Sequence, residues 1–111
     1  MAKGGVVMQV TVGRIVHYVL SALDADTINR RRVPGVGHSE GWPEGAQAHV
    51  GNPAYAGGIV PAIVVWPHNN AVQSFNGQAF LDGNDVLWIT SVYYDESEQH
   101  GTWHWPPQVT A

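Results

Sequence analysis

The fold is decided by residues 72–94, which read VQSFNGQAFLDGNDVLWITSVYY. Two apolar runs, Val72–Leu81 and Val86–Tyr94, flank the polar segment Asp82–Asp85. Asp-Gly and Asn-Asp pairs between apolar runs are typical of a tight hairpin turn, because glycine and asparagine tolerate the positive φ that such turns need. The second run is rich in β-branched and aromatic residues, which suit a strand. We therefore predict an antiparallel hairpin in which Trp88 is buried.

Three further stretches read as strands. Residues 6–20 are apolar and break at Gly13, and the part after the break is apolar on both faces, which is typical of a central or doubly covered strand. Residues 59–66 are also apolar, and Pro61 near their start suits an edge strand or a first rung, because proline cannot donate to the ladder. In the closing residues 100–107, Trp103 and Trp105 point to the same side if the chain is extended.

One helix is expected, over residues 22–32. Ser21 and Asp24 have the spacing of a capping box, and acidic residues at the start with arginines at the end match the helix dipole. Val33-Pro34-Gly35 ends it. Together the elements predict a single all-β domain over residues 1–111 with five to six strands. It is either a small, partly open SH3-like barrel or a compact two-sheet sandwich.

Residues 35–58 form a long loop rich in glycine and proline. Loops of this length inside a compact domain are uncommon and usually functional or disordered, and Trp42 and Tyr55 argue against simple disorder. We interpret the segment as an assembly element that stands apart from the β domain. Deleting residues 37–56 is therefore expected to leave that domain folded.

The composition excludes several classes of protein. Charged residues make up 13% of the chain, roughly half the usual share, so part of its surface is expected to lie against a partner. The net charge of −4 and a single basic cluster, Arg30–Arg32, argue against nucleic-acid binding, which needs a broad positive surface. No signal peptide or membrane-spanning run is expected.

No catalytic or metal site is predicted. The chain has six histidines and no cysteine, and no histidine pair has the spacing of a zinc signature. Ser91, His17 and Asp95 are scattered, so they do not by themselves indicate a catalytic triad. The carboxylates of Asp95–Glu98 read as a solvated turn. We therefore expect no cofactor, no metal and no enzymatic activity.

The candidate interaction residues are aromatic or basic. Trp66 and Trp88 lie on strong strand patterns and are expected in the core. Tryptophan is enriched in interface anchors because it buries a large rigid area, so those outside regular strands can serve either the core or an interface. The arginines can be a solvated helix end or can contact an acidic partner. The interaction candidates are Trp42, Tyr55, Trp103, Trp105, Arg30, Arg31 and Arg32.

Four segments carry a resemblance: Gly13–Val19, Pro61–Val65, Asp82–Asp85 and Gly101–Pro106. The last, Gly-Thr-Trp-His-Trp-Pro, is the most specific. In these segments the chain resembles small uncharacterised β-domain proteins of tailed bacteriophages and prophages, and the resemblance does not cover residues 35–58. It implies a phage setting and a small β domain, and it carries no catalytic residue.

The leading hypothesis is a non-enzymatic phage structural protein, namely a small capsid decoration or cement protein. It would be made in the host cytoplasm and reside in the virion. Its expected partners are other virion proteins, with the major capsid protein suspected, and further copies of itself; no nucleic acid or membrane is expected. Two alternatives remain open: a phage protein that binds and inhibits a host enzyme, and a histidine-based metal-dependent hydrolase.

Overall fold

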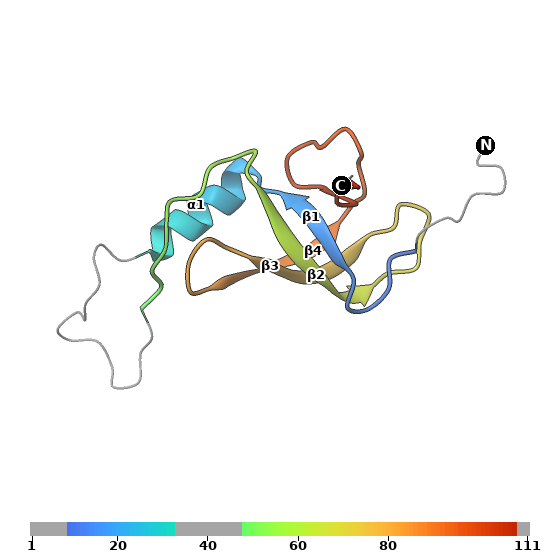
Figure 1. The fold of residues 1–111 in the computed structure, drawn as a ribbon, viewed down its shortest axis with the longest axis horizontal. Helices are drawn as coiled ribbons and strands as arrows, with labels where there is room; N and C mark the ends of the chain where they lie inside the picture. The colour runs from blue at the N-terminus through green and yellow to red at the C-terminus, as the bar shows by residue number, and fades with distance from the viewer. Residues whose placement is uncertain (1–8, 33–47, 109–111) are drawn as a thin grey trace.

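The computed structural model describes residues 9–32 and 48–108. These residues form β1 (Ile15–Val19), α1 (Ala22–Arg31), β2 (Ile59–Pro67), β3 (Phe75–Phe80), β4 (Val86–Val92) and β5 (Trp103–His104) (Figure 1). The strands pair antiparallel in one sheet of order β4-β3-β2-β1-β5. The predicted all-β class with a single short helix is confirmed. Of the two architectures considered, the described strands form one sheet rather than the two of a sandwich.

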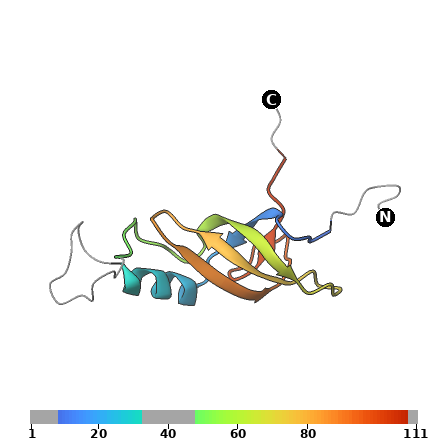
Figure 2. The same cartoon turned by 90° about the horizontal axis from the view of Figure 1, so that it is seen from below.

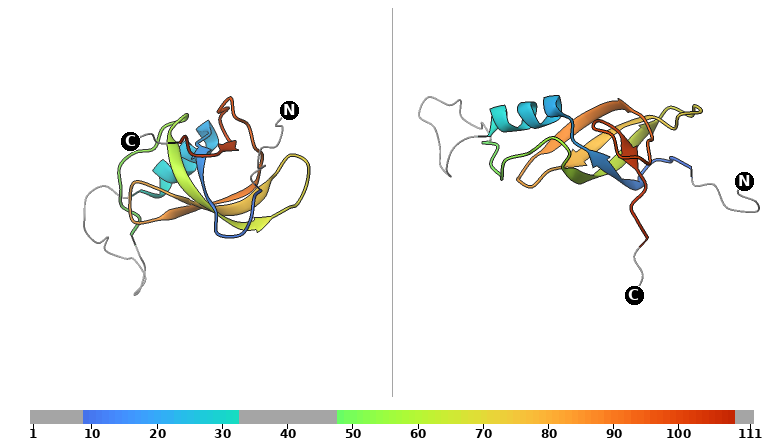
Figure 3. Two further views of the ribbon diagram at one scale, coloured as in Figure 1. Left: turned by 45° about the vertical axis from the view of Figure 1, so that its right-hand side comes forward. Right: turned by 90° about the horizontal axis from the view of Figure 1, so that it is seen from above.

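The two edges of this sheet meet at one point. Tyr94, just beyond β4, forms a parallel bridge with Trp103 of β5. The Trp103 N–H donates to the Tyr93 carbonyl at 2.9 Å, and the Asp95 N–H donates to the Trp103 carbonyl at 2.9 Å. The strongly twisted sheet in Figures 1 and 3 therefore curls until its edge strands are joined, as in a partly open barrel.

The predicted hairpin is confirmed. β3 and β4 pair through Phe80↔Val86 and Gln78↔Trp88, and the chain turns between them over residues 81–85. A register shift follows near the far end of the pair, where Ser91 has a φ of 50°. The Asn76 side chain accepts a hydrogen bond from the Ser91 N–H at 2.7 Å, which satisfies a donor that the irregularity would leave without a ladder partner.

β2 is an interior strand, so the expectation that Pro61 marks an edge is wrong. Pro61 is the third residue of β2 and pairs with His17 of β1. Hydrogen bonds run from the Val64 N–H to the Arg14 carbonyl and from the Leu20 N–H to the Gly58 carbonyl. Bonded pairs alternate along an antiparallel ladder, so β1 requires no N–H from Pro61. On the side of β2 that faces β3, the pairing begins at Ala62 and Ala79, and β3 ends at Phe80, opposite Pro61. Pro61 therefore lies at the end of that ladder.

The core lies between the concave side of the sheet and the segments that close its ends. β1 is an interior strand between β2 and β5, and it contributes Val16 and Tyr18 to this core. The largest side chains with almost no exposed surface are Trp103, Phe75, Ile28, Val16 and Val64. The strand expected before Gly13 is wrong in its described part: residues 9–12 form no strand, because the chain turns at Gly13, where φ is 89° and the Arg14 N–H donates to the Thr11 carbonyl. Val10 nevertheless packs into this core.

The helix α1 forms where the sequence predicts it. The Ser21 hydroxyl accepts from the Asp24 N–H at 3.0 Å, and the Asp24 carboxylate accepts from the Ser21 N–H at 2.9 Å, which completes the capping box. Ala25 and Ile28 are its buried residues, so the helix packs along a narrow face. It lies beside the turn that joins β3 to β4 (Figure 2).

A buried tyrosine ties this cap to β1. The Tyr18 hydroxyl donates to the Asp24 carboxylate at 2.5 Å, and burial, followed by this hydrogen bond and the Asp24 charge, raises the pKa of Tyr18. The folded protein therefore holds this proton more tightly than the unfolded chain. The resulting stabilisation is fully present below the ordinary tyrosine pKa of about 10, and it is lost as pH rises through the folded-state value.

Tyr18→Phe should lower the free energy of unfolding by about 1 kcal/mol at neutral pH, because it removes one hydrogen bond. The variant should also lose stability less steeply than the wild type above pH ~10, because it lacks the shifted group. Urea unfolding at a series of pH values measures both effects. Tyr93 is 55% exposed, so Tyr93→Phe is a matched control that should change neither. Parallel alkaline slopes for Tyr18→Phe and wild type would contradict the linkage.

Candidate protein-interaction surface

Two tryptophans that the sequence places in the core lie on the surface. Trp88 and Trp66 are each 67% exposed, so the prediction that they are buried is wrong. Their strands are correctly predicted, but both side chains point away from the core. The inward positions of β4 are instead Leu87 and Ile89. In β2 the register shift between Val64 and Trp66 leaves both Val65 and Trp66 exposed.

These two tryptophans belong to one continuous surface. Register places the outward residues of β2, β3 and β4 in cross-strand rows, such as Ile63–Gln78–Trp88 and Trp66–Asn76. We call this surface the outer sheet face. Its members are Ile59, Pro61, Ile63, Val65, Trp66, Asn76, Gln78, Phe80, Val86, Trp88 and Thr90.

The outer sheet face carries no charge. None of the five strands contains Asp, Glu, Lys or Arg; the charged residues of the described chain lie in α1 and in turns and loops. The solvent face of an antiparallel sheet normally alternates with polar residues. Here the outward positions are almost as apolar as the inward ones, so the surface has the composition of the core of an interface.

The closing tryptophans form part of the barrel itself. Trp103 is completely buried, and its indole N–H donates to the Gln73 carbonyl at 2.8 Å. Trp105 is partly buried and packs edge-on against Trp103, with ring centroids 4.9 Å apart, while the Arg14 guanidinium lies 5.6 Å from the Trp105 ring. Of the three tryptophans left open between core and interface, Trp103 therefore serves the core and leaves no surface for a partner, Trp105 is partly buried, and Trp42 lies outside the described residues.

The three arginines are paired within the chain. Arg30 pairs with Asp26 at 2.9 Å on the exposed side of α1. Arg31 and Arg32 both bind the Asp85 carboxylate, at 3.1 and 2.5 Å. The Asp85 side chain is only 3% exposed, so this pair of contacts is a buried link from the end of α1 to the β3–β4 turn.

Two glycines make room for the Arg32 guanidinium. A Cβ on Gly51 would lie 2.8 Å from the Arg32 Cζ, and a Cβ on Gly83 would lie 2.8 Å from its Nη1. The two glycines also form a bridge with each other. A larger residue at either position would first clash with the opposite backbone, since the Cβ would lie 2.5 Å from the Asp82 carbonyl oxygen at Gly51 and 2.6 Å from the Val50 carbonyl oxygen at Gly83, and it would also crowd the guanidinium.

Part of the long loop is built into this link. The Asn84 side chain donates to the Ala48 carbonyl at 3.0 Å and accepts from the Val50 N–H at 3.0 Å. The Asn29 side chain of α1 makes two hydrogen bonds to the backbone of Ala54, at 2.8 and 2.9 Å. Residues 48–54 therefore join the helix to the hairpin, so deleting residues 37–56 would remove contacts that the fold uses. Trp42 and the rest of the loop up to residue 47 lie outside the described residues.

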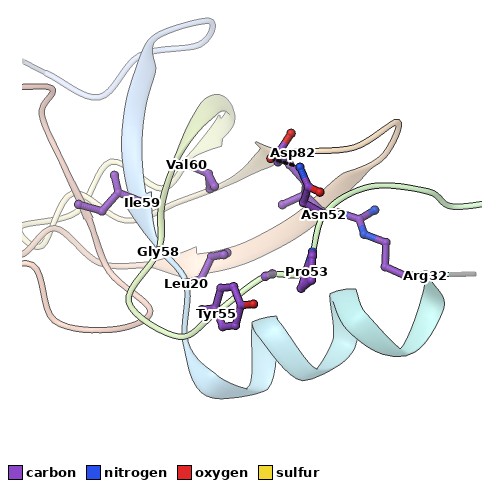
Figure 4. Close-up of a pocket in the computed structure, with 11 residues that line it drawn as sticks. Leu20, Arg32, Asn52, Pro53, Tyr55, Gly58, Ile59, Val60 and Asp82 are labelled. Atoms are coloured by element: carbon purple, nitrogen blue, oxygen red, sulfur yellow. Dashed lines mark hydrogen bonds between the residues drawn. The ribbon is translucent and has the colours of Figure 1, made fainter. Parts of the chain in front are cut away.

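Tyr55 is an exposed aromatic in the described part of the long loop, with 71% of its surface exposed. It lines a small pocket of about 160 Å³ between the loop and the barrel (Figure 4). The walls are mainly apolar, and at one end the Asn52 amide donates to the Asp82 carboxylate at 2.8 Å. Arg32 also lines the pocket, and within the described residues its Nε and Nη2 have no hydrogen-bond partner. The pocket therefore offers a partner mainly shape and apolar contact, with the Arg32 guanidinium as its one positive group.

The histidines and carboxylates of the described residues do not gather into a metal site. His17 and His104 face each other across β1 and β5 with ring centroids 5.6 Å apart, and Glu98 lies 3.9 Å from His104. Across residues 9–32 and 48–108, no three His, Cys, Asp or Glu side chains are placed to hold a metal ion. Two of the three residues considered as a possible catalytic triad have other neighbours: the His17 ring packs against His104, and the Asp95 carboxylate accepts a hydrogen bond from Ser97.

The loop after β4 is held by its own hydrogen bonds. The Ser97 hydroxyl and N–H donate to the Asp95 carboxylate at 2.6 and 2.9 Å and lower the pKa of Asp95. Desolvation of the Tyr94 ring, followed by the nearby Glu96 charge, raises the pKa of Tyr94. Both shifts favour the charge state that each group already has at neutral pH.

Fold and surface together define a small β domain whose most distinctive feature is an exposed, uncharged aromatic face. Comparison with known proteins adds no family to this description: no protein-family model matches the chain, and no curated protein or solved structure matches it. In the part of the chain that the structure describes, α1 is neither long nor apolar enough to cross a membrane.

Proposed function

We propose that this protein is a non-enzymatic structural protein that works through protein–protein contacts made by the outer sheet face. The observation that carries the proposal is the exposure of Trp66 and Trp88 on a face without charge. Tryptophan supplies much of the binding energy in protein interfaces, and exposed apolar patches of this kind mark interaction sites. A surface without acid, base or nucleophile at its centre is suited to binding.

The setting that we propose is a bacteriophage particle, in which the protein decorates the capsid. Support comes from the resemblance of the Gly101–Pro106 segment and its companions to small phage proteins, and from the low share of charged residues, 13%. A decoration protein needs a stable small fold and an adhesive surface. Both requirements agree with a barrel whose strands hold no charged residue.

Particles purified from the phage or prophage that encodes this chain provide the test. Quantitative mass spectrometry should find the protein in fixed stoichiometry with the major capsid protein. Trp88→Glu should abolish attachment, because burying an unpaired charge in an apolar interface is costly. Leu23 is 73% exposed on α1, so Leu23→Glu adds the same charge elsewhere and should leave attachment intact. A protein that stays free in the lysate would contradict the proposed role.

A further inference from the structure

We infer that the occupant of the outer sheet face is a second copy of this chain, which packs the same face against it in a two-fold dimer. The inference rests on the proposed role of this face in protein contacts and names its partner. Two properties of the face support it: its area and its lack of charge.

The exposed area matches what a stable dimer requires. Trp66 and Trp88 are each 67% exposed, and Phe80, Val86, Val65 and Ile59 are 42–47% exposed. With a full aromatic residue presenting about 150–250 Å², the face offers roughly 700–800 Å² of accessible surface. A standard interface buries about 800 Å² on each partner, whereas the largest apolar patch on an ordinary monomer is about 300–600 Å².

The charge distribution favours a contact between like copies. The chain carries a net charge of −4, so contact between two copies is opposed least through a surface that places no like charges directly opposite each other. The outer sheet face is such a surface: its eleven residues include no Asp, Glu, Lys or Arg. A charged partner would find no opposite charge there, and nucleic acid would find no positive groups.

A two-fold contact also covers the outer sheet faces of both copies in a single interface. In an isologous interface the same patch serves both partners, so one contact removes both outer sheet faces from water. The amides of Asn76 and Gln78 lie among the apolar side chains and are partly buried. They can supply the few polar contacts that interface cores contain.

Sedimentation velocity on the full chain tests the inference. The wild type should sediment as a dimer at about 100 μM, since interfaces of this size bind in the micromolar range or tighter. Trp88→Glu and Trp66→Glu should each raise the dimer dissociation constant at least about 30-fold, as the loss of a tryptophan hot spot does. Leu23→Glu adds the same charge on α1 and should dimerise as the wild type does. Circular dichroism and melting temperature verify that each variant is folded.

A second measurement needs no variant. Acrylamide quenching of tryptophan fluorescence should decrease as the wild type is concentrated, because dimerisation covers two of its most exposed indoles. A monomer at about 100 μM with unchanged quenching would overturn the inference, because an interface of this area should then be populated. Unaltered dimerisation by both glutamate variants would overturn it as well.

The outcomes separate this inference from the proposed function. A wild-type monomer that attaches to particles and loses attachment in Trp88→Glu would show that the face binds another protein. That result overturns the dimer and retains the structural role. A dimer that is absent from purified particles would retain the inference and contradict the phage role.

Discussion

Replacing Trp103 with alanine is expected to lower the free energy of unfolding by about 3–5 kcal/mol, as large deletions in a core do. Trp103 is completely buried and contacts the rings of Phe75, Tyr94 and Trp105 at centroid distances of 5.7, 5.0 and 4.9 Å. It also supplies the backbone bridge that joins β5 to the end of β4. The cavity would therefore open where the edges of the sheet meet.

Urea unfolding followed by circular dichroism measures this loss. Trp88→Ala is the matched control when both proteins are measured at concentrations at which the chain is monomeric, because dimerisation would add to apparent stability. The residue type is the same, but Trp88 is 67% exposed, so its loss should then cost less than about 1 kcal/mol. Trp103→Phe should restore part of the stability by filling some of the cavity, although the Gln73 carbonyl loses its donor. Equal losses for Trp103→Ala and Trp88→Ala would contradict the assignment of these side chains to core and surface.

Removal of the Asp85 carboxylate is expected to be similarly severe. Asp85→Ala should lower the free energy of unfolding by about 3–5 kcal/mol, because breaking a buried pair leaves an uncompensated charge behind. The charge in question belongs to Arg32, whose side chain is 9% exposed. In the described part of the chain its Nε and Nη2 already have no hydrogen-bond partner, so Asp85 is its principal anchor.

The ion pair of Arg30 with Asp26 offers the control for this prediction. It is a salt bridge of the same type on the same helix, but its side chains are 78% and 52% exposed. Exposed pairs contribute about 0–1 kcal/mol, so Asp26→Ala should change stability little. Hydrogen exchange should also show faster opening of residues 48–54 in Asp85→Ala, because the β3–β4 turn holds them in place. An Asp85→Ala protein as stable as Asp26→Ala would disprove the buried link.

Local chemistry in the sequence was enough for the hairpin and the helix, but not for the run before Gly13, where residues 9–12 form no strand. The Asp82–Asp85 segment predicts the hairpin turn, because its residues tolerate the backbone angles that the turn requires. Ser21 and Asp24 predict the start of α1, because capping is an interaction between residues three positions apart. The hairpin turn and the helix cap depend on residues close together in the chain, so the sequence alone predicts them.

Tertiary structure decided which tryptophans are buried. Trp66 and Trp88 sit in strands as strongly apolar as the core itself, and period-two alternation assigns them to a face without saying which face is covered. One signal in the sequence was available: in β4, Leu87 and Ile89 already supply the inward positions, so Trp88 must face the other way. Only the single-sheet topology shows that nothing within the described residues covers that outward side.

The sequence by itself therefore determined the class of fold, the hairpin, the capped helix and the shortage of charge. The fold decided the rest, because it brings together residues far apart in the chain. The Asp85 carboxylate binds Arg31 and Arg32, which lie more than 50 positions away in the chain. These candidate partner contacts therefore form ion pairs within the domain. Pairing of β2, β3 and β4 in one register gathers scattered apolar residues into the outer sheet face, and no local pattern can encode that juxtaposition.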